Sequence, residues 1–100
     1  MSLKRVLWTS ILMGPRVAPY VKRLEEAGLE VIPNPYRRML TEEELTRAIP
    51  GVFATVASSE PYTERVFQAA DALRIIARFG VGYDKVDVPA ATRHGVRDQP

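Results

Sequence analysis

The segment Arg78-Phe79-Gly80-Val81-Gly82-Tyr83-Asp84 has the residue types and spacing most suggestive of chemistry in this 100-residue chain. Two glycines two positions apart let backbone N–H groups turn toward one point, and such a concavity binds anions. The guanidinium of Arg78 adds positive charge beside it. The same glycines also suit a strand-to-helix turn that needs positive φ. Both interpretations stay open, and Arg78 favours the anion site.

A second polar segment is Ser58-Ser59-Glu60-Pro61, which precedes a predicted helix. Its two hydroxyls would lie beside the free N–H groups at the start of that helix, where anions are favoured. Ser58 and Ser59 are therefore candidate ligands for a carboxylate. The alternative is that they cap the helix, and the two roles are compatible.

The remaining polar residues do not indicate a common type of catalytic site. A dinucleotide-binding fingerprint is not indicated, because Lys85 takes the place of the third glycine and no further strand–helix–strand unit follows. His94 has no partner in the sequence to orient it for catalysis. Asp84 and Asp87 are spaced like turn and cap residues. With no cysteine and one histidine, the chain does not suggest a metal site.

The elements that must position these segments follow from hydrophobic patterning. Four short apolar runs predict strands, and the third is apolar almost throughout, as in a parallel sheet covered on both faces. The runs are Val6–Trp8, Val31–Ile32, Val52–Ala57 and Leu73–Ala77. The polar or glycine-rich residues that follow the strands are then expected to gather at the carboxyl edge of the sheet, where ligands bind.

Helical signals separate the strands. Val17, Val21 and Leu24 form one apolar stripe that closes at Gly28, and Thr41 with Glu44 forms a capping box. A third helix is expected to open at Pro61, and a fourth to start at an Asp87 N-cap and end at His94-Gly95.

The predicted order is βαβαβαβα, an α/β fold with a flavodoxin-like open parallel sheet. Such a sheet normally has a fifth strand. After Val96 the chain continues with the polar residues Arg97-Asp98-Gln99-Pro100. We therefore expect the fifth strand to be missing or degraded, and residues 1–100 to form one truncated domain.

Composition limits the class of protein. Hydrophobic residues make up 46% and charged residues 26%, with a net charge of +2. These values suit one globular domain and give no basis for nucleic-acid binding, because the basic residues are dispersed. No secretion signal or membrane span is evident, so a cytoplasmic location is the default expectation.

The residues Arg78 to Asp87, followed by Ala90-Ala91 and His94-Gly95-Val96, resemble the D-2-hydroxyacid dehydrogenases, especially phosphoglycerate dehydrogenase-like members. The resemblance extends over residues 4 to 96. It implies the flavodoxin-like substrate-binding domain of an oxidoreductase whose separate Rossmann domain binds NAD. It further implies that Gly80, Val81 and Gly82 present backbone amides to a substrate carboxylate and that Ser58 and its neighbours line the same cleft.

The predicted substrate-binding residues are therefore Ser58, Ser59, Arg78, Phe79, Gly80, Val81 and Gly82. The family's catalytic Arg, Glu and His belong to the later domain, and His94 does not match that histidine. No catalytic, cofactor or metal-binding residue is assigned to this chain. Ala57 stands where phosphoglycerate dehydrogenases often have arginine, which argues against phosphorylated substrates.

These observations lead to one leading interpretation and one alternative. The leading interpretation is a truncated substrate-binding domain that is not catalytic alone, because the Rossmann domain and its NAD are absent, and that forms a homodimer, with domain swapping as one route. The alternative is a stand-alone module that binds small carboxylate or phosphate anions weakly through the Gly80 to Gly82 loop.

Overall fold

A computed structural model describes residues 4–9, 18–34, 36, 38–57, 60–78 and 86–99 of the chain. Strands and helices alternate along the described residues, as the hydrophobic pattern predicts. Their bounds are β1 Lys4–Trp8, α1 Ala18–Glu26, β2 Leu29–Pro33, α2 Glu42–Ala48, β3 Val52–Ala57, α3 Glu64–Ala69, β4 Ile75–Arg78, α4 Val88–Arg93 and β5 Arg97–Gln99.

The strands form one parallel sheet in the order β2-β1-β3-β4-β5, which confirms the predicted flavodoxin-like fold class. The expectation of a missing or degraded fifth strand needs correction. Ile75 pairs in register with Arg97, and the Arg97 N–H donates to the carbonyl of Arg74 at 2.8 Å. Backbone pairing does not require apolar side chains, so the polar residues after Val96 still form a short edge strand.

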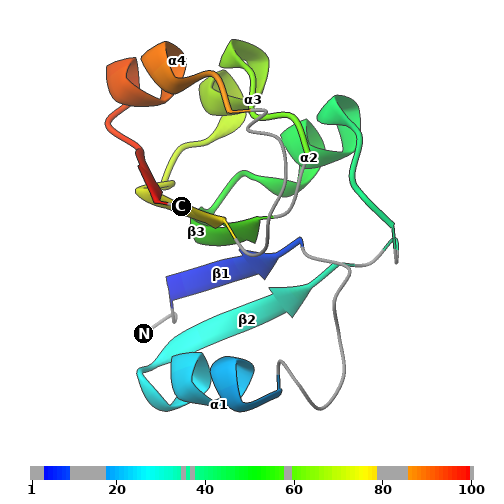
Figure 1. Ribbon diagram of the computed structural model, residues 1–100, viewed down its shortest axis with the longest axis vertical. Coiled ribbons are helices and arrows are strands. Elements are labelled where there is room, and N and C mark those ends of the chain that lie inside the picture. The colour runs from blue at the N-terminus through cyan, green and yellow to red at the C-terminus, as the bar shows by residue number, and fades with distance from the viewer. Residues whose placement is uncertain are drawn as a thin grey trace.

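Figure 1 shows α2, α3 and α4 together on one side of the sheet, with α1 beside β2 on the other side. Right-handed crossovers place α1 on one face of the sheet and α2 to α4 on the other. The chain moves across the sheet in one direction from β1 to β2 and in the opposite direction from β2 to the later strands. Strand order therefore reverses at β1, which lies between β2 and β3.

Local signals fix most helix ends. Thr41 and Glu44 form the predicted capping box, and Asp87 caps α4 by accepting a hydrogen bond from the Ala90 N–H. Gly28 has a φ of 87°, as its place after α1 requires. The prediction that α3 opens at Pro61 is wrong, since α3 begins at Glu64 after Tyr62 pairs with Val86 in a parallel bridge.

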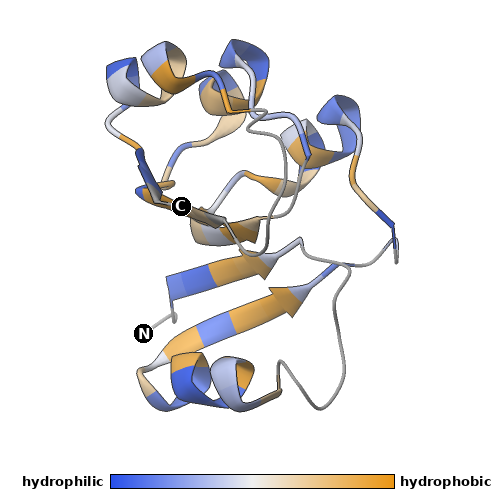
Figure 2. Ribbon diagram, viewed as in Figure 1, coloured by the Kyte–Doolittle hydropathy of each residue, from blue (hydrophilic) through white to orange (hydrophobic). Residues whose placement is uncertain are grey.

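The main core lies between the sheet and helices α2 to α4. Figure 2 shows hydrophobic residues along the strands and polar ones on the outer sides of these helices. Fully buried members include Leu45, Phe67 and Ile76. Within the part of the chain that the structure describes, every helix is too short or too polar to cross a membrane.

Candidate functional site at the carboxyl edge of the sheet

The ends of β1 and β3 lie side by side at the position where strand order reverses. Trp8 and Val56 are partners in the register, and the Thr9 N–H donates to the Val56 carbonyl at 3.0 Å. In open parallel sheets this position is where ligands bind, because the helical connections leave it on opposite sides. The structure thus places the exits of β1 and β3 together at the expected edge.

Beneath that edge lies a buried polar group that we call the Glu60 cluster, defined by Thr9, Thr55, Glu60 and Tyr62. Each of these residues is at most 1% exposed. The Tyr62 hydroxyl lies 2.8 Å from Oε2 of Glu60 and 3.0 Å from the Thr55 hydroxyl oxygen. The Thr9 hydroxyl also contacts Oε2 of Glu60. The carboxyl therefore joins the exit of β1 to the segment that follows β3.

The phenol of Tyr62 stays protonated in this environment. Burial raises its pKa well above the ordinary value, and the neighbouring carboxyl of Glu60 adds to the rise. A neutral phenol has one proton to donate. Tyr62 therefore acts as a hydrogen-bond donor to the carboxyl and as an acceptor for the Thr55 hydroxyl.

The exit of β2 is organised by Asn34. Its side-chain amide donates to the carbonyls of Thr9 at 2.9 Å and Arg38 at 2.8 Å, and its oxygen accepts from the Tyr36 N–H at 2.8 Å. Both polar atoms of the amide are thus used to shape the loop. Asn34, which lies at one of the predicted polar exits, joins the β2 exit to the β1 exit.

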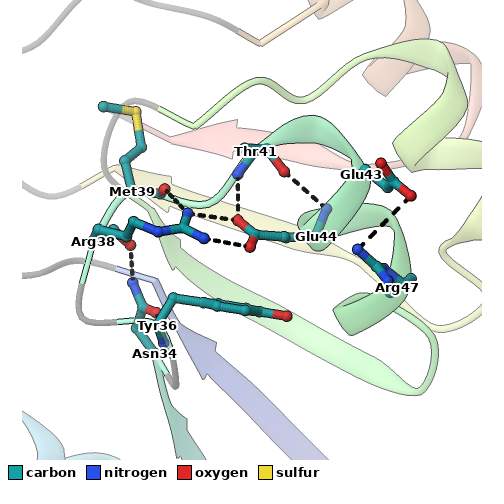
Figure 3. A network of polar contacts seen from close by, with 8 residues as sticks. All are labelled: Asn34, Tyr36, Arg38, Met39, Thr41, Glu43, Glu44 and Arg47. Atoms are coloured by element: carbon teal, nitrogen blue, oxygen red, sulfur yellow. Dashed lines mark hydrogen bonds and ion pairs between the residues drawn. The ribbon is translucent and has the colours of Figure 1, made fainter.

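A second carboxylate, Glu44, lies beyond this loop in what we call the Glu44 network, defined by Arg38, Thr41 and Glu44 (Figure 3). Arg38 donates to both carboxylate oxygens at 2.8 and 2.6 Å, and the Thr41 N–H donates at 3.0 Å. The hydrogen bonds from Arg38, followed by that from Thr41, lower the pKa of the Glu44 carboxyl to about 2. The arginine is thus neutralised within the loop.

Of the predicted substrate-binding residues, Ser58, Ser59, Phe79, Gly80, Val81 and Gly82 lie outside the described residues, and Arg78 is described only as the last residue of β4. Their roles stay predictions. The residues that flank them are placed, however. Ala57 and Arg78 are register partners where the two segments begin, and Tyr62 and Val86 are bridged where they end. The residues that flank the first segment are therefore backbone neighbours of the residues that flank the second.

The helix-cap interpretation of Ser58 and Ser59 is wrong for α3, because Thr63 occupies its N-cap position. His94 ends α4, as predicted, and it has partners that the sequence did not reveal. Its Nε2 lies 2.7 Å from Glu64, and its ring stacks on Phe67 with centroids 5.8 Å apart. These contacts join α3 to α4 and support a structural role for His94.

The sequence pattern did not single out the carboxyl of Glu60. In the sequence, Glu60 is an acidic residue directly after two serines and before Pro61. Such a position is equally compatible with a solvent-exposed side chain, so the sequence does not predict burial. The buried carboxyl of Glu60 contacts the hydroxyl of Thr9, which follows β1 and lies 51 positions away, and the hydroxyl of Tyr62, two residues later. Only the fold brings them together.

The described residues at this edge do not fit a dinucleotide. Thr9 fills the exit of β1 against an acidic group, where a pyrophosphate would need backbone donors at a helix N-terminus. Among the described residues, no group of three His, Cys, Asp or Glu could hold a metal ion.

The open parallel sheet, with its strand order reversing at β1, defines a flavodoxin-like α/β domain. The family model of the D-isomer specific 2-hydroxyacid dehydrogenase catalytic domain matches residues 11–97. The chain belongs to this family, as the sequence resemblance indicated. It is 42% identical over 92 residues to glyoxylate reductase from Pyrococcus furiosus, covering 84% of this chain and 27% of that protein.

It is also 35% identical over 78 residues to D-3-phosphoglycerate dehydrogenase from Synechocystis sp., covering 73% of this chain and 14% of that protein. A Thermus thermophilus protein of known structure matches 94% of this chain at 33% identity and a TM-score of 0.76, over 29% of its own length. NAD⁺-bound 3-phosphoglycerate dehydrogenase from Entamoeba histolytica matches 95% of this chain and 32% of its own, with a TM-score of 0.74; at 23% identity it supports the fold alone. The chain thus spans between 14% and 27% of the two curated relatives.

Proposed function

We propose that this chain forms the substrate-side wall of the active-site cleft in an NAD-dependent D-2-hydroxyacid dehydrogenase, and that these 100 residues do not transfer hydride alone. The supporting observation is the placement of the flanking residues. Ala57 pairs with Arg78 and Tyr62 bridges Val86, so the residues that flank the two candidate ligand segments are neighbours at one edge of the sheet. That edge is where ligands bind in open parallel sheets.

The substrate class follows from the chemistry of the two segments. Backbone amides around Gly80 and Gly82 and the hydroxyls of Ser58 and Ser59 are donors, and they suit the carboxylate of a small 2-hydroxy or 2-oxo acid. Ala57, which is fully buried, ends β3 without a cationic side chain. A phosphorylated substrate would lack a charge partner at that position, so we favour unphosphorylated acids such as glycerate or glyoxylate.

Binding is tested by titrating D-glycerate into the labelled chain and following backbone amide signals. We expect gradual, saturable shifts at Ser58, Ser59, Val81 and Gly82, with weak affinity because one wall of the cleft encloses a ligand incompletely. Inorganic phosphate serves as the comparison anion and should bind more weakly. Unmoved signals at all four positions up to high glycerate concentration would contradict the substrate-side assignment.

The catalytic part of the proposal concerns the cofactor. In the whole enzyme NAD supplies the hydride-transfer chemistry, and the described residues of this chain offer no site for it. Mixing the purified chain with NAD⁺ and a panel of 2-hydroxy acids should therefore give no increase in NADH absorbance. Sustained turnover that survives repeated purification would contradict the proposal.

We also propose that the isolated chain self-associates. Ala54, Val56, Ile75 and Ala77 share the sheet face opposite α2 to α4 and are half-buried, and in the described part of the chain α1 alone is the helix on that side. Such a partly covered apolar face favours a partner. Light scattering after size exclusion should give a dimer mass, reduced toward monomer by Val56→Gln. A monomer at every concentration would contradict it.

A further inference from the structure

We propose that α1 is a lid on the sheet: it detaches from β2 while the rest of the fold stays intact, and its detachment extends the apolar face that the sheet presents. This inference goes beyond the proposed function and needs neither a ligand nor self-association. Helix α1 differs from the other three helices in its burial, in its neighbours and in the strand that it covers.

Burial separates α1 from the other helices. No residue of α1 is buried, and Val21 and Leu24, which form its apolar stripe, are only half-buried. Each of the other helices contributes two buried residues, namely Glu44 and Leu45 in α2, Val66 and Phe67 in α3, and Ala90 and Ala91 in α4. Tyr20 also interacts with another residue, yet it is 53% exposed. Because α1 removes so little apolar surface from water, the free energy of its local opening is low.

The neighbours of α1 are few. Within the described chain α1 packs mainly on β2, an edge strand whose partner in the sheet is β1. Figure 1 shows α2, α3 and α4 on the other side of the sheet, where Arg93 of α4 donates to Glu64 of α3 at 2.6 Å. Among the described residues, the main core contains no residue of α1. Detachment of α1 therefore breaks no contact within that core, and the core does not need to unfold with it.

The strand beneath α1 belongs to a row of apolar residues that crosses the sheet. Ile32 packs against the main core, so its neighbour Val31 points to the opposite face of β2, toward α1. Val31 pairs in register with Val6, and Val6 with Ala54. Ala54 pairs in turn with Ile75, and residues paired in this way share a face of the sheet. Since Ala54 and Ile75 are already half-buried, detachment of α1 adds Val31 to the apolar surface on this face.

Amide hydrogen exchange on the dilute chain, without ligand, measures the detachment. The Leu24 N–H reports on α1, and the Thr55 N–H, in the middle of β3, reports on unfolding of the whole sheet. We expect the protection factor at Leu24 to be at least about tenfold lower than at Thr55. Urea should accelerate exchange steeply at Thr55 and only slightly at Leu24, because detachment exposes little surface. An equally steep dependence at both amides would overturn the proposal.

A core variant separates detachment from global unfolding. Val66→Ala leaves a cavity at a fully buried position of α3, so exchange at Thr55 should accelerate at least about tenfold. The contacts of α1 are unchanged in this variant, and exchange at Leu24 should stay within about twofold of the unmodified chain. Equal acceleration at Leu24 and Thr55 would contradict the lid, because α1 would then open only when the whole chain unfolds.

A matched pair of helix variants tests what the lid covers. Lys22 is exposed, and Lys22→Gly should accelerate exchange at Leu24 about fivefold relative to Lys22→Ala, because glycine weakens the helix without removing a packed side chain. The chain has no cysteine, so Val31→Cys places a single thiol beneath α1. Labelling of that thiol should be about fivefold faster with Lys22→Gly than with Lys22→Ala. Equal labelling rates, or equal exchange at Leu24, would overturn the proposal.

Discussion

The side-chain carboxyl groups of Glu60 and Glu44 lie in different environments, and we expect them to contribute differently to the stability of the fold. Glu60 is buried with neutral hydroxyl donors, whereas Glu44 accepts two hydrogen bonds from Arg38, whose side chain is 56% exposed (Figure 3). The Glu60 cluster has the larger penalty for disruption, because water cannot replace a lost partner there. We therefore expect stability to depend more on the buried Glu60 cluster than on the Glu44 network, whose arginine is exposed.

The largest expected effect comes from deleting the buried carboxyl. Glu60→Ala leaves a cavity and removes the acceptor for the Thr9 and Tyr62 hydroxyls, so it should lower the unfolding free energy by about 3 kcal/mol. Urea denaturation measures this. The matched control is Glu43→Ala, because the Glu43 side chain is 65% exposed and should change little. Equal losses in the two variants would remove the distinction between the regions.

A smaller loss is expected when only one donor is removed. Tyr62→Phe keeps the buried ring and deletes the hydroxyl that contacts Glu60 and Thr55, so it should cost about 1–2 kcal/mol. Thermal and urea unfolding report the change. A variant as stable as the unmodified chain would show that the buried carboxyl is satisfied without Tyr62.

Within the Glu44 network, the backbone cap should matter more than the ion pair. Thr41→Ala removes the side-chain oxygen that accepts from the Glu44 N–H at 3.2 Å and should cost about 1 kcal/mol. Thr41→Ser keeps that oxygen and should retain most of the stability. The urea concentrations at the unfolding midpoints of Thr41→Ala and Thr41→Ser measure this difference. Identical midpoints would show that the cap does not stabilise α2.

The ion pairs should appear mainly as pH dependence. The carboxyls of Glu44 and Glu64 have pKa values of about 2 in the folded protein against an ordinary value of 4.5, owing chiefly to hydrogen bonds from Arg38 and Arg93 respectively. Because the folded-state pKa values are lowered, the stabilisation is present above pH 4.5 and is lost as pH falls toward 2. Glu44→Gln should reduce the decline measured by urea unfolding across this range.

Repeating the pH dependence of urea unfolding at high salt tests the contribution of the ion pairs further. Arg38 and Arg93 are both exposed at the side chain, so high salt should flatten the acid dependence of the unmodified chain while leaving the loss in Tyr62→Phe unchanged. If the unfolding free energy of Glu44→Gln falls with pH as steeply as that of the unmodified chain, carboxyl groups other than that of Glu44 control the stability in acid. The smallest effect is expected for Arg38→Gln at neutral pH and high salt.

The sequence determined the alternation of strands and helices because those signals are local. The capping box at Thr41, the Asp87 cap and the glycine after α1 act within a few residues, and each was confirmed. The start of α3 was predicted too early, since Tyr62 pairs with Val86 across the fold instead of entering the helix. Likewise β5 forms on the β4 template despite its polar residues.

The sequence by itself also determined which edge of the sheet to consider, because parallel strands place all their exits at one side and the polar segments follow the strands. Only the tertiary structure decided which residues organise that edge. The buried carboxyl of Glu60 contacts the hydroxyl of Thr9, 51 positions away, and the Asn34 amide donates to the carbonyls of Thr9 and Arg38. Burial and hydrogen-bond partners are properties of the folded chain, and no local pattern of residue types specifies them.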